Sequence, residues 1–290
     1  MSLWPLRRER QTMMERFYNP VLVKELKLRF RSFKSFSGLM FYLAVLCIVI
    51  AGFLLLTTQF TGRGFFRPDT SFAMFAVLTM LQMALVLFMT PSLTAGAISS
   101  EREKQTLNIL LTTTQSSTQI VIGKLLSSVA FLVLLLVAGL PLYSLVFLFG
   151  GVSPSQLVAT FLFYLVTVIS IGSLGVMFST ITKKTIVAMI ATYGSIIFLG
   201  GITAFFFFLT MAFQEISPSS TSFMTYFWAS INPGALMLTL ISPSIGESLA
   251  EISGINVPVW VTYLIVYSSI TILSLTVAIK KLRANMKSNR

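Results

Sequence analysis

The chain has 290 residues, of which 55% are hydrophobic and only 10% are charged. A soluble domain carries about 25% charged residues, so this composition excludes an ordinary globular protein and indicates an integral membrane protein. The formal net charge is +12, with 21 Lys and Arg against 9 Asp and Glu, and its distribution favours membrane spans with basic cytoplasmic ends over a nucleic-acid-binding protein.

The first 38 residues predict a cytoplasmic tail followed by an amphipathic helix in the membrane interface. Asn19 and Pro20 are a helix start signal, a capping side chain followed by the residue favoured at the first helical position. From there to about residue 36, apolar and basic residues occupy separate faces, which is typical of a helix at the lipid headgroups; an ordinary surface helix is the alternative. The apolar face carries Leu22, Leu26, Phe30 and Phe33, and the basic face carries Lys24, Lys27, Arg31 and Lys34.

Residues 39–281 form one predicted transmembrane domain with six apolar runs that carry no charge. Each run is long enough to cross about 30 Å of hydrocarbon at about 1.5 Å per residue. Pro91 and Pro141 lie within the second and third runs and predict kinks there. The fold class is therefore an all-α polytopic membrane protein, with spans expected near 39–60, 72–98, 125–149, 157–180, 186–212 and 258–279.

The basic residues predict the orientation of these spans. Six spans place both termini on one side of the membrane. If that side is the cytoplasm, nineteen of the 21 Lys and Arg lie inside, and only Arg63 and Arg67 lie outside. The opposite orientation would invert this ratio, so we expect cytoplasmic termini, with a short tail at 282–290.

Residues 100–111, between the second and third spans, predict a short cytoplasmic helix. Ser100 and Glu103 have the spacing of a capping box, and the charged residues around them keep the start of the helix in water. Leu107, Leu110 and Leu111 then recur on one face. Such a helix either presents its charged end to a soluble partner or is a solvated loop helix without one.

The outer segment before the last span, residues 213–257, contains an apolar piece at 226–241 that is interrupted in the middle, and each half is too short to cross the membrane. Asn232 and Pro233 interrupt it and have the pattern of a helix cap and a first helical residue. Ser244 and Glu247 have the spacing of another capping box. We expect one or two short re-entrant helices in the outer half of the membrane, with a folded surface loop as the alternative.

Gln82 is the only amide side chain well inside a predicted span. An unpaired amide in lipid costs about 1–3 kcal/mol or more, so we expect this side chain to face protein. Its helix face is a candidate translocation path, with packing between spans as the alternative. This face carries Thr79, Gln82, Met83, Val86 and Thr90. Phe205 to Phe208 are expected to face lipid rather than to form a gate.

The sequence lacks the residues that several kinds of site need. The chain has no histidine, which excludes a His-based triad. It has one cysteine, Cys47, and one aspartate, Asp69, which excludes a thiolate metal cluster and an intramembrane aspartyl pair. No titratable carboxylate, Lys or Arg lies inside a span, which disfavours a proton-driven carrier and leaves Na⁺ coupling open. Leu125 follows Gly123-Lys124, so the chain has no phosphate-binding loop. We expect neither an enzyme nor a bound cofactor.

The segment from Ser100 to Leu111, with Ile122-Gly123-Lys124 after it, resembles the permeases of bacterial type-2 ATP-binding-cassette (ABC) exporters. The family pattern is roughly an acidic-Arg-acidic cluster, Gly-Thr-Leu, two leucines and a later Gly-Lys. Lys24-Glu25-Leu26 is similar to the family's N-terminal interfacial helix. Gln105 stands where the family commonly has glycine.

The resemblance implies a permease subunit of the cell membrane that works as a dimer, with a second permease, identical or related, and two copies of a separate ATPase that binds ATP and Mg. The helix at 100–111 would be the coupling helix, the first, second and fifth spans would line the path, and the outer helices would form its exit gate. An apolar path suits an amphipathic or hydrophobic cargo, such as a drug, peptide or lipid-like molecule. The alternative function is a gradient-driven carrier or channel without an ATPase. The ATPase-contacting residues would be Glu101, Arg102, Glu103, Lys104, Thr106, Leu107, Leu110 and Leu111.

Overall fold

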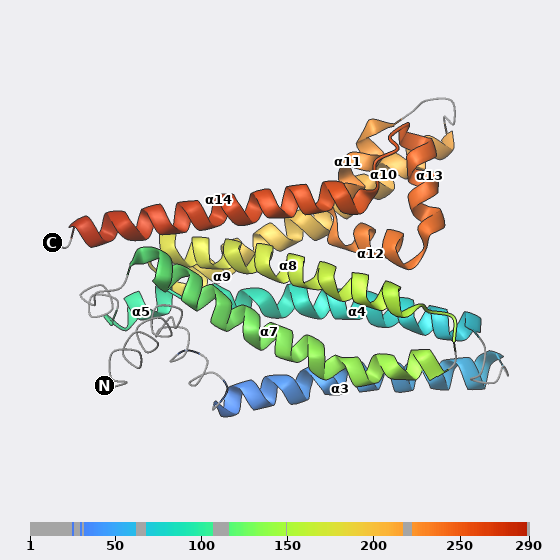
Figure 1. Cartoon of the computed structure of the whole chain (residues 1–290), viewed down its shortest axis with the longest axis horizontal. Coiled ribbons are helices and arrows are strands. Elements are labelled where there is room, and N and C mark those ends of the chain that lie inside the picture. Colours follow the sequence, from blue (N-terminus) through green and yellow to red (C-terminus); the bar gives the residue numbers. More distant parts are fainter. Residues whose placement is uncertain are drawn as a thin grey trace, which may run out of the picture.

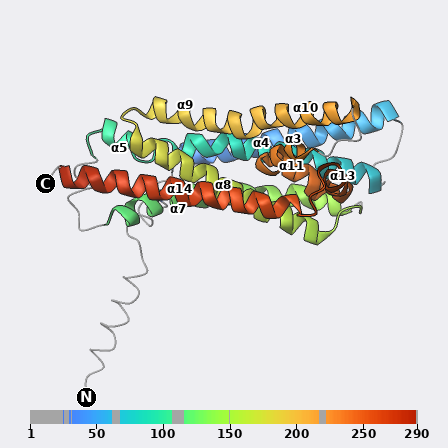
Figure 2. The same ribbon diagram turned by 90° about the horizontal axis from the view of Figure 1, so that it is seen from above.

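The computed structural model describes residues 25, 30, 32–61, 68–106, 116–148, 150–216 and 222–288. These residues form helices and connecting turns without a β-strand, and the long helices run side by side as a bundle (Figures 1 and 2). Six helical segments are long and apolar enough to cross a membrane, which confirms the all-α polytopic fold. They are α3 (Phe33–Thr61), α4 (Pro68–Thr94), α7 (Ser117–Leu148), α8 (Pro154–Ile181), the fifth span built from α9 (Thr185–Ile196), η1 (Ile197–Ile202) and α10 (Thr203–Ile216), and α14 (Val259–Ser288).

The helices continue beyond the apolar runs that predict them. α7 begins at Ser117, so Gly123 and Lys124 lie within this helix rather than before it. Pro91 and Pro141 lie inside α4 and α7, as expected. A helix that continues past the hydrocarbon carries its polar residues beyond the lipid, which is how α7 brings Lys124 to a charged site.

The beginning of the first span corrects one expectation. α3 starts at Phe33, before the expected start of the span near residue 39, so Phe33 and Lys34 lie in the same helix as the first span. Lys24, Lys27 and Arg31 lie outside the described residues. Phe30 is described as helical, and its ring centroid lies 6.2 Å from that of Phe131 in α7.

α8 is the central helix, in contact with α4, α7, α9 and α14. Its Gly175 lies against the end of α4, where an added Cβ would be 2.9 Å from the Cβ of Thr94. Real Cβ atoms essentially never approach so closely, so glycine allows the two helices to meet at this point. This contact brings the chain that follows α4 to the end of α8.

The fifth span contains a feature that the sequence analysis missed. Residues 197–202 form a π-helical turn, η1, between α9 and α10. Gly200 and Gly201 lie within it, and this glycine pair is the available sequence signal. A π turn inserts an extra residue into the helix and often marks a functional joint.

The described part of the outer segment that follows residue 221 forms three short helices, α11 (Phe223–Ile231), α12 (Pro233–Ile241) and α13 (Pro243–Ser253). α12 and α13 are bent by 116° at the break between them. The side chain of Asn232 accepts a hydrogen bond from the N–H of Ala235, 2.9 Å away, with Pro233 at the first helical position, so this predicted cap is confirmed. The capping box at Ser244 is wrong, because α13 is preceded by Ser242 and has no side-chain cap.

Candidate functional site

One end of the bundle collects basic residues, and we call it the basic end. α5 (Ser99–Glu103), the start of α9 and the end of α14 lie there, whereas α13 lies at the opposite end (Figure 1). α13 carries two exposed carboxylates, Glu247 and Glu251. The basic residues of the basic end whose side chains the structure describes are Arg102, Lys104, Lys124, Lys183, Lys184, Lys280, Lys281 and Arg283.

α5 follows α4 through a turn at residues 95–98 and is anchored to α8. The hydroxyl of Ser179 accepts hydrogen bonds from the N–H groups of Ile98 and Ser99, at 2.8 and 2.9 Å. The Ser100 hydroxyl instead donates to the carbonyl of Gly96. The predicted capping box is therefore wrong, because α8 satisfies the first N–H groups of this helix.

Lys124 joins three segments that are far apart in the sequence. Its Nζ lies 2.9 Å from Oε1 of Glu25 and 3.1 Å from Oε1 of Glu101. The Lys124 side chain is 6% exposed, whereas the two carboxylate side chains are 24% and 28% exposed. The two carboxylates compensate the charge of the nearly buried ammonium, and their partial contact with solvent limits the cost of taking these ions out of water. The segment before the first span, α5 and α7 are thereby tied together.

Arg102 and Glu103 of α5 bind the two ends of the short connection between α8 and α9. The Arg102 guanidinium donates to the carbonyls of Thr182 and Thr180, at 2.7 and 3.1 Å. The Glu103 carboxylate accepts from the N–H and the hydroxyl of Thr185, both at 2.8 Å. The cation thus lies at a helix C-terminus and the anion at a helix N-terminus, which suits both helix dipoles.

The same contacts set the protonation of Glu103. The hydrogen bond from the Thr185 N–H, followed by that from the Thr185 hydroxyl, lowers the pKa of this exposed carboxyl at the end of α5. Both bonds favour the ionised form. Glu103 therefore carries its charge at neutral pH.

α5 ends at Glu103, which corrects the expectation of one helix over residues 100–111. Gln105 has a φ of 58°, in the left-handed region, and the chain turns back there. The Thr106 N–H donates to the Glu101 carbonyl at 2.9 Å, and its hydroxyl donates to the Glu101 carboxylate at 2.8 Å. Leu107, Leu110 and Leu111 lie outside the described residues.

Replacing Gln105 with glycine is expected to stabilise the chain by about 0.5–1 kcal/mol, because glycine adopts this backbone conformation without a steric penalty. The change should raise the melting temperature of the purified chain by roughly 1–4 °C. The matched control is Lys104→Gly, at an exposed neighbour whose φ of −79° suits any residue, and it should not raise the melting temperature. Equal shifts in the two variants would contradict the role of the φ angle.

The candidate path residues lie inside the single chain. Thr79, Gln82 and Thr90 are fully buried, and Met83 and Val86 are almost so. The Tyr42 hydroxyl donates to Oε1 of Gln82 at 2.7 Å. This burial favours packing between spans, which is the alternative interpretation of this face.

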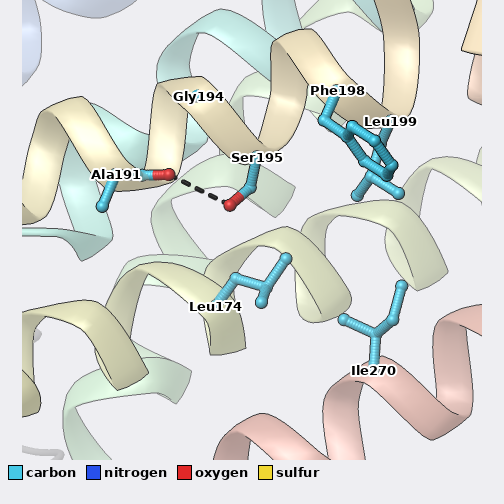
Figure 3. A pocket seen from close by; sticks show the side chains of 7 residues that line it. All are labelled: Leu174, Ala191, Gly194, Ser195, Phe198, Leu199 and Ile270. Atoms are coloured by element: carbon cyan, nitrogen blue, oxygen red, sulfur yellow. Dashed lines mark hydrogen bonds between the residues drawn. The ribbon is translucent and has the colours of Figure 1, made fainter. Parts of the chain in front are cut away.

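A pocket of about 460 Å³ lies on the fifth span, between α9–η1, α8 and α14 (Figure 3). Its lining is almost entirely apolar, and the Ser195 hydroxyl is already donated to the carbonyl of Ala191 at 3.0 Å. Such a surface suits hydrocarbon or aromatic groups and offers little to an ion. The lining residues are Leu174, Ala191, Gly194, Ser195, Phe198, Leu199 and Ile270.

Residues 205–208 do not share one environment. Phe205 and Phe208 are 64% and 63% exposed, as a lipid-facing position requires. Phe207 is buried, and the ring of Phe206 stacks on Trp228 of α11 with centroids 4.9 Å apart. Phe206 is still 37% exposed, so Phe207 is the one ring of these four that is buried inside the chain.

The charged contacts of the basic end join the residues that carry the resemblance: Glu25, the Glu-Arg-Glu cluster and Lys124. The sequence model described as ABC-2 family transporter protein matches residues 55–280, which is more than half of the chain. Comparison with curated proteins found no match. With its six apolar helices, the chain is a multi-pass membrane transport component and belongs to the ABC-2 transporter family.

Proposed function

We propose that the chain is the permease subunit of an ATP-driven exporter in the bacterial cell membrane. Two permeases, identical or related, form the path, and two copies of a separate ATPase bind ATP and Mg. The observation that carries this proposal is the set of contacts made by α5, whose side chains connect it directly to α7, α8 and α9. They bind Lys124 of α7, the carbonyls of Thr180 and Thr182 at the end of α8, and Thr185 of α9. Lys124 also binds Glu25, so the segment before the first span joins this set indirectly.

The charge distribution supports an orientation with the basic end in the cytoplasm. Basic residues flank the spans at this end, and the exposed carboxylates of Glu247 and Glu251 lie at the other. Lys and Arg are retained on the cytoplasmic side of membrane proteins. A soluble ATPase would then meet the chain beside α5.

The internal contacts revise which residues meet the ATPase. Glu101, Arg102 and Glu103 use their charges within the chain, so their proposed role is to transmit a displacement of the segment to the spans. Lys104 and Thr106 are exposed and remain proposed contacts. The segment 107–111 follows directly and supplies the proposed apolar anchor.

The cargo that this proposal favours is amphipathic or hydrophobic. The pocket beside η1 has an almost wholly apolar lining, and most of its lining residues belong to the fifth span (Figure 3). The family resemblance assigns this span to the path. Apolar groups gain free energy by leaving water for such a surface. A drug, peptide or lipid-like molecule has these groups.

The proposal is tested by purifying the tagged chain from its native host in mild detergent and identifying the proteins that accompany it. We expect a stoichiometric soluble protein with a phosphate-binding loop, and transport by the reconstituted complex that requires ATP. A Lys104→Glu variant should retain less of this protein, whereas Lys281→Glu, at an exposed lysine at the end of α14, should retain it fully. A chain that purifies alone and transports on an ion gradient without ATP is a carrier, which overturns the proposal.

A further inference from the structure

Asn232 belongs to the outer segment and contacts the fifth span. It separates α11 from α12 and is 3% exposed. Its Oδ1 caps α12 by accepting from the Ala235 N–H at 2.9 Å. Serine or aspartate could perform this capping equally well, so the cap alone does not require an amide.

The amide nitrogen of Asn232 makes a second set of contacts, to the π-helical turn. Nδ2 donates to the Gly200 carbonyl at 2.7 Å and to the Thr203 hydroxyl oxygen at 2.8 Å. A π turn shifts the helical hydrogen bonds out of their usual register, and an added donor stabilises a carbonyl at such a point. A side-chain amide can accept at its oxygen and donate two hydrogen bonds from its nitrogen. Asn232 makes all three of these bonds.

Other contacts fix the outer segment to α8 and α14. Gln156 of α8 donates from Nε2 to the carbonyls of Leu240 and Ile241, at 2.9 and 2.7 Å. The hydroxyls of Tyr226 and Thr262 lie 2.7 Å apart and link α11 to α14. The fifth span meets the segment mainly where α10 packs along α11, with the rings of Phe206 and Trp228 stacked, and at η1 through Asn232. Asn232 therefore supplies the side-chain hydrogen bonds to η1, and apolar packing joins α10 to α11.

We propose that Asn232 is a positioning residue for transport, which makes the outer segment move together with η1 of the fifth span. The inference rests on the proposed function, because the movement is the one that ATP drives in the exporter. Asn232 touches no cargo in this role. It acts by holding α12 against the turn at which the fifth span can bend.

Two substitutions separate this link from the cap. Asn232→Asp keeps a capping oxygen of the same shape and loses both N–H donors, and Asn232→Ser keeps a capping oxygen without adding charge. The matched control is Tyr226→Phe, which removes a link from the outer segment to α14 and leaves the fifth span untouched. All variants carry Cys47→Ser, so that introduced cysteines are the only labelled ones.

The experiment measures distances between spin labels at exposed positions of the full chain. One pair, Met224 and Ile202, joins α11 to η1, and a reference pair, Met224 and Leu162, joins α11 to α8. In both Asn232 variants we expect the distance distribution of the first pair to broaden about twofold, while that of the reference pair is unchanged. In the exporter trapped with nucleotide, the first distance should stay fixed with Asn232 present and change in the variants.

The outcomes distinguish this inference from the proposed function. The first measurement needs no ATPase, so broadening in the chain alone establishes the link even if no ATPase partner exists. Unchanged distributions in both variants overturn the link, as does broadening in Asn232→Asp alone, which would be the effect of a buried charge. Equal broadening in Tyr226→Phe would show general loosening and overturn it too. A first distance that changes on trapping with Asn232 present overturns the coupled movement.

Discussion

Replacing Lys124 with methionine is expected to destabilise the chain by about 3 kcal/mol and to abolish transport. The change removes the cation that separates the carboxylates of Glu25 and Glu101, at 2.9 and 3.1 Å from its Nζ. Two carboxylates then face each other beside an apolar side chain, and the segment before the first span separates from α5. For a chain of this size the melting temperature should fall by roughly 6–12 °C.

A triple variant gives the control for this prediction. Glu25→Gln and Glu101→Gln, added to Lys124→Met, remove both carboxylate charges along with the cation. Replacing all members of a buried ion cluster is often close to neutral for stability, so the melting temperature should return to within about 2–4 °C of the original, which corresponds to about 1 kcal/mol. If the triple variant melts as low as Lys124→Met, the loss comes from packing of the lysine stem rather than from unpaired carboxylates.

The spans could be predicted from the sequence because hydrocarbon imposes a simple requirement. A helix that crosses a membrane needs a long uncharged run, and the chain contains six of them. The cap at Asn232 could also be predicted, because a capping side chain and the proline after it are local in sequence. The ends of the spanning helices could not be predicted in the same way. α7 continues through Lys124, because the charge of this lysine is paired with carboxylates from other segments.

The arrangement of the charged site depends on contacts that the sequence does not encode locally. Ser100 and Glu103 have capping-box spacing, yet Ser179 of α8 satisfies the start of α5, and Glu103 binds Thr185 instead. These partners are about eighty positions away, and only the packing of α4 on α8 brings them near. One local signal was available: Gln105 stands where the family commonly has glycine, and its φ of 58° explains why.

Removing the charges of Arg102 and Glu103 together is expected to uncouple ATP hydrolysis from transport. Arg102→Met with Glu103→Met leaves the net charge unchanged and breaks the four hydrogen bonds to Thr180, Thr182 and Thr185. The pairing of Lys124 with Glu101 and Glu25 remains, so the chain should still fold and bind the proposed ATPase. Displacement of α5 would no longer pull the connection between α8 and α9.

Proteoliposomes containing the permease and its ATPase measure this effect as transport per ATP hydrolysed. We expect this ratio to fall at least about tenfold, because the two charge-assisted contacts no longer transmit the movement. Hydrogen exchange of the Thr185 amide, which loses its acceptor, should accelerate in the isolated chain and gives a reading that needs no ATPase. Lys104→Met, one position further along, is the control and should leave the exchange of this amide unchanged. A normal transport ratio with accelerated exchange would mean that α8 and α9 respond to the ATPase through another segment.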